Sequence, residues 1–109
     1  MLYGYVGTMG TQPGRRAEVI AILLRDVEGL REAGCSSYVV SISNAEPDLI
    51  YVSEVWQSKD HHDASLKLPT TRAAIAEAMP MLTGEFAGED YEVVGGLGLG
   101  SPTSATAPR

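Results

Sequence analysis

The sequence predicts an α+β fold in which helices cover one face of a four-stranded antiparallel sheet. Strand patterns occupy four segments, residues 2–10, 35–43, 49–56 and 86–94. One helical stretch separates the first strand from the second, and another separates the third from the fourth. A short turn joins the second strand to the third, so these two strands should pair as a hairpin.

The first strand is loose, because Gly4, Gly7 and Gly10 interrupt it. Glycine weakens a strand and often marks a bulge, or a close approach of the backbone to a ligand or another chain. After the Pro13-Gly14 turn, one helix is predicted from about Arg15 to Ala33. Its apolar residues recur every three or four positions and form one stripe, namely Ile20, Leu23, Leu24, Val27 and Leu30.

The hairpin strands differ in how much apolar surface they carry. The second strand alternates, with Tyr38, Val40 and Ile42 on its apolar face. The third strand is apolar at most positions, which predicts that both of its faces are covered. One face carries Val52, Glu54 and Trp56, and the other carries Tyr51, Ser53 and Val55.

The second helical stretch is divided by a proline. Ser58 is the predicted N-cap of a short helix from Lys59 to Lys67, and Pro69 interrupts this helix. A further helix should run from about Thr70 to Met79. Its inner side would carry Ala73, Ile75, Ala76, Met79 and Leu82. The resulting order, β-α-β-β-α-β, is the ferredoxin-like arrangement.

Length and composition indicate one globular domain. The chain has 109 residues, and the domain is predicted to span residues 1–94. Residues 95–109 are rich in Gly, Ser, Pro, Thr and Ala, and should form a flexible tail. The net charge of −6 argues against nucleic acid or a membrane surface as a partner. No apolar run could span a membrane and no signal-peptide pattern occurs, which predicts a cytoplasmic protein.

The predicted sheet has one face without helices. The third strand would place apolar residues on that face as well as on the covered one. A large apolar patch is unusual on the surface of a monomer. The simplest cover is a second copy of the chain, packed sheet to sheet with two-fold symmetry, so we expect a homodimer.

Four short motifs occur in a characteristic order. They are Pro13-Gly14 before the first helix, Gly34-Cys35 and Tyr38 entering the second strand, Glu54-Val55-Trp56 closing the third strand, and Pro69. This succession resembles the antibiotic biosynthesis monooxygenase family over roughly residues 2–94. The resemblance implies a homodimeric α+β barrel with a pocket between sheet and helices. It also implies, for some members, oxygenation of polyketide anthrones or hydroquinones without metal or flavin; others degrade haem, isomerise small phosphorylated signals or have no known activity.

Two departures from the family pattern affect the expected chemistry. Many members carry a histidine nine residues after the strand-end tryptophan, and that position here is Ser65. The available histidines are His61 and His62, which lie nearer the start of the helix. The polar and aromatic positions of the haem-degrading branch fall on Gly7, Ser65 and Ile75, which argues against haem degradation.

The chain contains few residues suited to catalysis. Trp56 could form a flat apolar wall with one N–H donor, and only one of His61 and His62 can face a given pocket, because neighbouring helix residues point about 100° apart. The catalytic candidates are Trp56, His62 and Tyr51. The substrate-binding candidates are Tyr38, Glu54, Ser65 and Arg72. For each of them a packing, salt-bridging or solvent-exposed role is an open alternative.

These residues lead to three functional hypotheses. The first is a cofactor-independent monooxygenase acting on a small aromatic molecule of the quinol, anthrone or polyketide type. The second is a non-catalytic dimeric module that binds a small ligand or regulates an enzyme. This hypothesis is favoured by Ser65, which stands where many family members have a histidine. The third is a cofactor-free isomerase or cyclase. No cofactor is expected, and no metal site, because neither histidine has a ligand-type residue four positions on.

Overall fold

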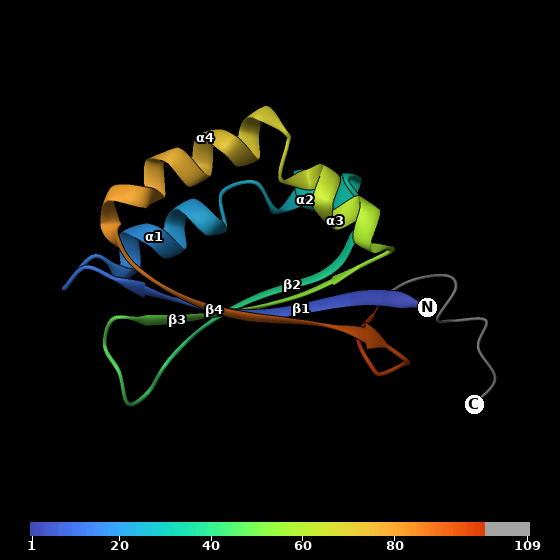
Figure 1. Ribbon diagram of the computed structural model, residues 1–109, viewed down its shortest axis with the longest axis horizontal. Coiled ribbons are helices and arrows are strands. Elements are labelled where there is room, and N and C mark those ends of the chain that lie inside the picture. The colour runs from blue at the N-terminus through green and yellow to red at the C-terminus, as the bar shows by residue number, and fades with distance from the viewer. Residues whose placement is uncertain (100–109) are drawn as a thin grey trace.

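Helices cover one face of a four-stranded antiparallel sheet and leave the other face bare (Figure 1). The computed structural model describes residues 1–99. The elements in chain order are β1 (Leu2–Thr11), α1 (Arg16–Leu23), α2 (Val27–Glu32), β2 (Cys35–Ile42), β3 (Leu49–Trp56), α3 (Lys59–Ser65), α4 (Pro69–Ala78), the 3-10 turn η1 (Met79–Met81) and β4 (Leu82–Val93). The ferredoxin-like α+β prediction is confirmed. Of the predicted tail, residues 100–109 lie outside the described residues.

The strands lie in the order β2-β3-β1-β4, so β1 is flanked by the third and fourth strands. The register places Tyr5 of β1 opposite Glu54 of β3, and Glu54 opposite Tyr38 of β2. Two residues nearer the start of β1, Tyr3 lies opposite Trp56 of β3. Side chains alternate between faces along a strand. These five residues therefore share the face that also carries the buried core positions of β3.

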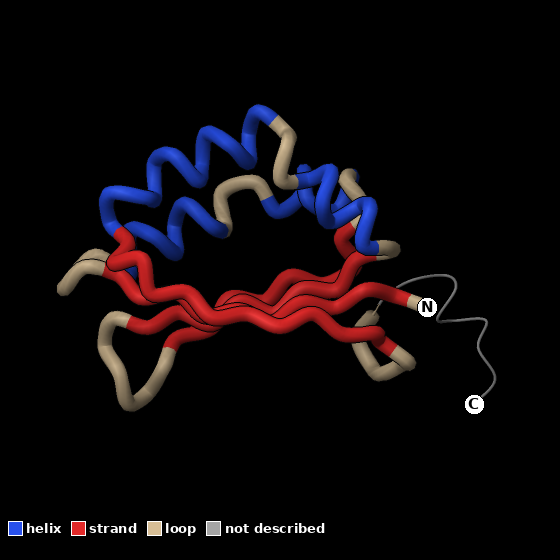
Figure 2. The backbone as a smooth tube through the Cα atoms, viewed as in Figure 1, coloured by secondary structure: helices blue, strands red, loops and turns tan. Residues whose placement is uncertain are grey.

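The core lies between the sheet and the two longer helices, which Figure 2 shows as separate layers. It is formed by Val19 and Ile22 of α1, Ile50 and Val52 of β3, Ala78 of α4 and Met81 of η1. Helices α1 and α4 lie over one end of the sheet (Figure 1). The short helices α2 and α3 lie over the other end, where the polar and aromatic side chains of the sheet are found.

The first helical stretch is not one helix, as the sequence predicted, but two. The residues between Leu23 and Val27 form a turn, and the Asp26 carboxylate accepts a hydrogen bond from the Gly29 N–H at 3.2 Å. Such a cap starts a new helix with a new orientation. The predicted apolar stripe was therefore wrong beyond the break, since Leu24 and Val27 are exposed. Within α1, Val19 and Ile22 are the buried residues, and the predicted Ile20 and Leu23 are partly buried and pack against the same core.

The buried side of the last helix also differs from the prediction. Ile75 and Met79 are 46% and 50% exposed, whereas Ala78 and Met81 are buried. Pro69 does not merely interrupt a helix but occupies its first turn, where the missing N–H costs no hydrogen bond. Beginning the helix at Pro69 and ending it in η1 turns Ala78 and Met81 toward the sheet. Leu82, predicted as a helical residue, is the first residue of β4.

The bare face of the sheet carries several exposed apolar side chains. They are Val6, Val39, Tyr51 and Tyr91, one from each strand, and each is between 40% and 51% exposed. Both faces of β3 were predicted to be covered, and the helices of residues 1–99 cover one of them. Among the described residues, no helix is long and apolar enough to cross a membrane.

Candidate functional site

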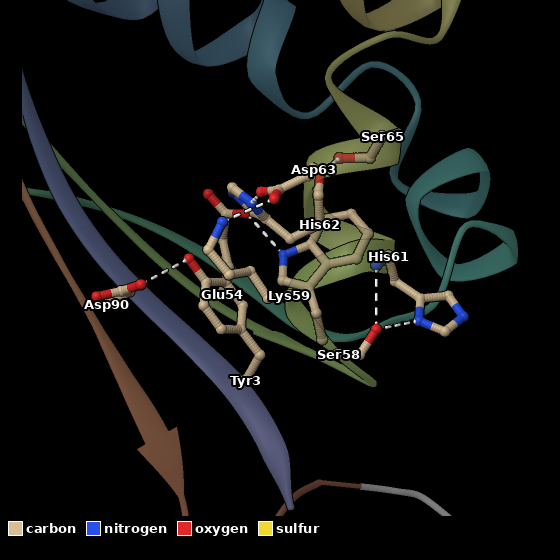
Figure 3. A network of polar contacts seen from close by, with 10 residues as sticks. Tyr3, Glu54, Ser58, Lys59, His61, His62, Asp63, Ser65 and Asp90 are labelled. Atoms are coloured by element: carbon tan, nitrogen blue, oxygen red, sulfur yellow. Dashed lines mark hydrogen bonds and ion pairs between the residues drawn. The ribbon is translucent and has the colours of Figure 1, made fainter.

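The short helix α3 brings a histidine back over the end of β3. The helix begins after Ser58, whose Oγ accepts a hydrogen bond from the His61 N–H at 3.1 Å. The Ser58 hydroxyl also lies 2.6 Å from His61 Nδ1, which keeps that imidazole at the helix start (Figure 3). Because adjacent helical residues point in different directions, His62 faces the sheet instead. Its side chain is only 14% exposed.

Three aromatic rings surround the His62 imidazole. The ring centroids of Tyr3 and Tyr5 lie 5.2 Å and 5.7 Å from it, both in tilted arrangements. The indole of Trp56, which is 1% exposed, meets it edge-on at 5.7 Å. The fourth contact is polar, since His62 Nδ1 lies 3.0 Å from a carboxylate oxygen of Asp63. This leaves Nε2 as the imidazole nitrogen available to a ligand.

Asp63 is suited to orienting that imidazole. Its hydrogen bond with Lys59, at 2.7 Å, and its contact with His62 both hold its pKa below the ordinary value. The carboxylate is therefore ionised near neutral pH and accepts a hydrogen bond from Nδ1. A carboxylate that holds one imidazole nitrogen as an N–H leaves the other as a proton acceptor.

A second carboxyl group lies beneath the imidazole. Glu54 accepts a hydrogen bond from Trp56 Nε1 at 2.8 Å (Figure 3). Burial raises the Glu54 pKa, whereas the Trp56 hydrogen bond and the nearby His62 partly offset that rise. Burial penalises the charged form of a carboxyl group, and hydrogen-bond donors favour it. The Trp56 N–H is thus engaged within the protein and holds Glu54 in place.

A phenol group flanks Glu54 on the neighbouring strand. Burial is the largest cause that raises the pKa of Tyr38, followed by the nearby charge of Glu54. The hydroxyl therefore stays protonated at neutral pH and can donate a hydrogen bond. Another group on this strand, the Cys35 thiol, is buried and donates to the Ser37 carbonyl at 3.2 Å. Burial raises the pKa of Cys35 to about 11, so it is a poor nucleophile.

A surface pocket of about 400 Å³ lies next to this cluster, at the end of the sheet. Its walls include Tyr3, Lys59 and Asp90, and the Tyr3 hydroxyl lies 3.4 Å from the Asp90 carboxylate. Tyr3 therefore both lines the pocket and packs against the His62 imidazole. Within residues 1–99, no group of three His, Cys, Asp or Glu side chains is placed to hold a metal ion.

The structure brings together four of the seven predicted site residues. Trp56, His62, Glu54 and Tyr38 share the covered face of the sheet or lie against it. The other three lie elsewhere. Tyr51 is on the bare face, Arg72 is exposed on α4, and the buried Ser65 hydroxyl donates to the His62 carbonyl at 2.6 Å within its own helix.

Two residues of the cluster, Tyr3 and Tyr5, are absent from the sequence prediction. The sequence pattern does place the two tyrosines on one face of the first strand, because Gly4 stands between them. It was not sufficient, because nothing local to that strand shows that β1 pairs with β3 or that α3 folds over it.

Comparison with known proteins agrees with the fold and with the family resemblance. The family described as antibiotic biosynthesis monooxygenase matches residues 3–77, more than half of the chain. No curated protein sequence shows significant similarity to the chain. Among solved structures, a candidate antibiotic biosynthesis monooxygenase from Chloroflexus aurantiacus J-10-fl is 39% identical, with a TM-score of 0.82. That match covers 92% of this chain and 100% of the other.

More distant structures share the fold. A candidate antibiotic biosynthesis monooxygenase from Caulobacter crescentus CB15 is 26% identical with a TM-score of 0.78, over 85% of this chain and 90% of the other. A single-residue mutant of SnoaB, a cofactor-independent oxygenase from Streptomyces nogalater, is 13% identical with a TM-score of 0.73, over 88% and 96%. From the family match and the Chloroflexus relative, the chain belongs to the antibiotic biosynthesis monooxygenase family.

Proposed function

We propose that this protein is a cofactor-independent oxygenase acting on a small hydroxylated aromatic molecule of the quinol or anthrone type. The observation that carries the proposal is the His62 imidazole, which is enclosed by three aromatic rings and held through Nδ1 by Asp63. Aromatic walls suit a flat apolar substrate, and an oriented imidazole suits removal of its proton.

The chemistry begins with the proton. His62 Nε2 accepts it from the substrate, and the charge that remains spreads over the aromatic system onto an oxygen. Tyr38, which keeps its own proton, donates a hydrogen bond to that oxygen. The electron-rich anion then reduces O₂ directly. For an anthrone, a ring CH₂ group and one O₂ give a ring carbonyl and one water, so the substrate itself supplies all the electrons.

Family membership supports this proposal at the level of reaction type. The Streptomyces nogalater protein that shares the fold is a cofactor-independent oxygenase. A fold by itself hosts many reactions, so the argument for chemistry rests on the His62 cluster.

Oxygen consumption by metal-free and flavin-free protein tests the proposal directly. The substrates would be a panel of hydroquinones and anthrones, with autoxidation in buffer subtracted. We expect uptake above autoxidation, reduced at least about 100-fold in His62→Ala because its proton acceptor is lost. The matched control is His61→Ala, which removes the neighbouring histidine from the exposed start of α3 and should retain native uptake.

The results separate this proposal from its alternatives. Saturable binding of the panel compounds without any O₂ uptake would replace it with a binding or regulatory module. A product formed without O₂ uptake would indicate an isomerase or cyclase. Equal loss of uptake in the two histidine variants would remove His62 from its assigned role.

We further propose that the working unit is a homodimer built on the bare face of the sheet. The support is the row of half-exposed apolar side chains there, Val6, Val39, Tyr51 and Tyr91. A second copy related by a two-fold axis presents the same patch and covers all of them at once. Each subunit then keeps its own His62 cluster, on the side of the sheet away from the partner.

A further inference from the structure

Tyr5 of β1 lies between Glu54 of β3 and Asp90 of β4, and its ring covers a part of the sheet that is made of glycine. Its ring extends over Gly7 of β1 and Gly88 of β4, which face each other across the two strands. A Cβ atom built on Gly88 would lie 1.9 Å from the Tyr5 hydroxyl oxygen, and one on Gly7 would lie 2.9 Å from the ring. We call Gly7 and Gly88 the glycine seat. Any larger residue at position 88 would displace the Tyr5 ring.

The Tyr5 hydroxyl has no hydrogen-bond partner among residues 1–99. The neighbouring Tyr3 donates toward Asp90, whereas the Tyr5 hydroxyl forms no hydrogen bond with any group of residues 1–99. No buried polar side-chain atom of the described residues lacks a partner, so this hydroxyl is accessible from outside. A fixed, accessible and unpaired donor is available to a ligand.

The position of Tyr5 places that donor at the proposed reaction site. Its ring lies 5.7 Å from the His62 imidazole, with 30° between the two planes. It also lies directly across the sheet from Glu54, on the side opposite Tyr38. The sheet thus presents two phenol groups on its covered face, one on each side of the Glu54 carboxyl group.

We infer that Tyr5 is a substrate-binding residue, whose hydroxyl donates a hydrogen bond to an oxygen of the aromatic ligand and whose position is set by the glycine seat. The inference rests on the proposed function in that it assigns the ligand to the same cluster. It deepens that function by requiring an oxygen substituent on the aromatic ring at the position that Tyr5 reaches.

Two probes of nearly equal shape test this requirement without any oxygenation. They are 1-naphthol, which carries a ring oxygen, and 1-methylnaphthalene, which carries a methyl group instead. Calorimetry should show that Tyr5→Phe weakens 1-naphthol binding about fivefold, the effect of one hydrogen bond, and leaves 1-methylnaphthalene binding unchanged. The control, Tyr91→Phe, removes the same hydroxyl from a ring on the bare face, and should retain native binding of both probes.

Substitutions in the glycine seat test the positioning separately. Gly88→Ala should weaken 1-naphthol binding by more than Tyr5→Phe does, because the whole ring is displaced. Gly4→Ala is its counterpart on the other face, where the added Cβ would meet the Tyr91 ring at 2.3 Å, and it should not weaken binding. Circular dichroism would show whether either glycine variant is folded. If Gly88→Ala is not folded, the Tyr5→Phe comparison still decides.

Three results would overturn the inference. They are no saturable binding of 1-naphthol to the native protein, unchanged 1-naphthol binding by Tyr5→Phe, or equal weakening of both probes in that variant. The proposed oxygenase function fails on different evidence. A protein that binds 1-naphthol through Tyr5 but consumes no O₂ would keep this inference and lose the oxygenase activity.

Discussion

Glu54 shows how one partly buried group can connect structure, stability and chemistry. Its carboxyl group lies on an apolar strand, and the indole N–H of Trp56 is its one hydrogen-bond donor within residues 1–99. Removing a carboxyl group from water favours its neutral form, which explains the raised pKa. The same shift makes the group able to release or accept a proton closer to neutral pH than an exposed glutamate can.

This residue predicts a specific dependence of stability on pH. The Glu54 pKa is higher in the folded protein than in the unfolded chain, so the folded protein binds that proton more tightly. The associated stability is complete below the ordinary glutamate pKa of 4.5 and is lost as the pH rises through the raised value. Glu54→Gln cannot ionise and keeps an acceptor for Trp56.

Urea denaturation at about pH 4 and about pH 7 checks this dependence. The difference in the free energy of unfolding, Glu54→Gln minus native protein, should be larger at the higher pH than at the lower pH. A relative stability that is equal at both pH values, or that changes in the opposite direction, would contradict a raised Glu54 pKa.

The two short helices, α2 and α3, begin with similar N-caps but differ in their relation to the candidate site. Asp26 caps α2, and Ser58 caps α3, each through one hydrogen bond to a backbone N–H three residues later. Short helices are marginal without such caps and tertiary contacts. Of these two helices, only α3 carries a residue of the candidate site, His62.

Removing either cap should therefore separate stability from activity. Asp26→Ala and Ser58→Ala should each lower the free energy of unfolding by about 1 kcal/mol. Ser58→Ala should in addition lower the rate of O₂ consumption, because it loosens the helix that holds His62. Asp26→Ala should retain the native rate on folded protein. Equal activity in the two variants would show that the start of α3 does not position His62.

At the same scale, sequence patterns located helices better than they located helix faces. The start of α4 was predicted within one residue, near Thr70, because Pro69 and the residues after it are a local signal for the start of a helix. Its buried face was predicted incorrectly, because the four-residue repeat through Ile75 and Met79 is compatible with either side. The break at Asp26 was missed because an apolar stripe continued past it.

The whole molecule is asymmetric, with helices on one side of the sheet and half-exposed apolar side chains on the other. Covering those side chains is favourable by about 25 cal/mol for each Å² of apolar surface removed from water. The His62 cluster faces away from this surface, so the proposed association and ligand binding use opposite sides of the same strands (Figures 1 and 3).

A single charge on the bare face should disrupt the dimer. Native protein at micromolar concentration should have twice the chain mass of 11.6 kDa by light scattering. Val6→Lys should shift the mass to that of one chain, because a buried unpaired ammonium group is strongly unfavourable in an apolar interface. The matched control is Ile75→Lys, which places the same charge on the exposed side of α4. A mass near 11.6 kDa for the native protein would contradict the dimer proposal.

Local sequence patterns were enough to establish the order of the strands, the hairpin, and the shared face of Glu54 and Trp56. These features depend on turns and on alternation within single segments. Only the assembled fold shows that Tyr3 and Tyr5 lie beside His62, and that Tyr51 lies on the bare face away from them. Those relations require β1 to insert between β3 and β4, and α3 to fold back over β3. Pairings between segments that are far apart in the chain leave no pattern within either segment, so the site emerges only when the sheet is assembled.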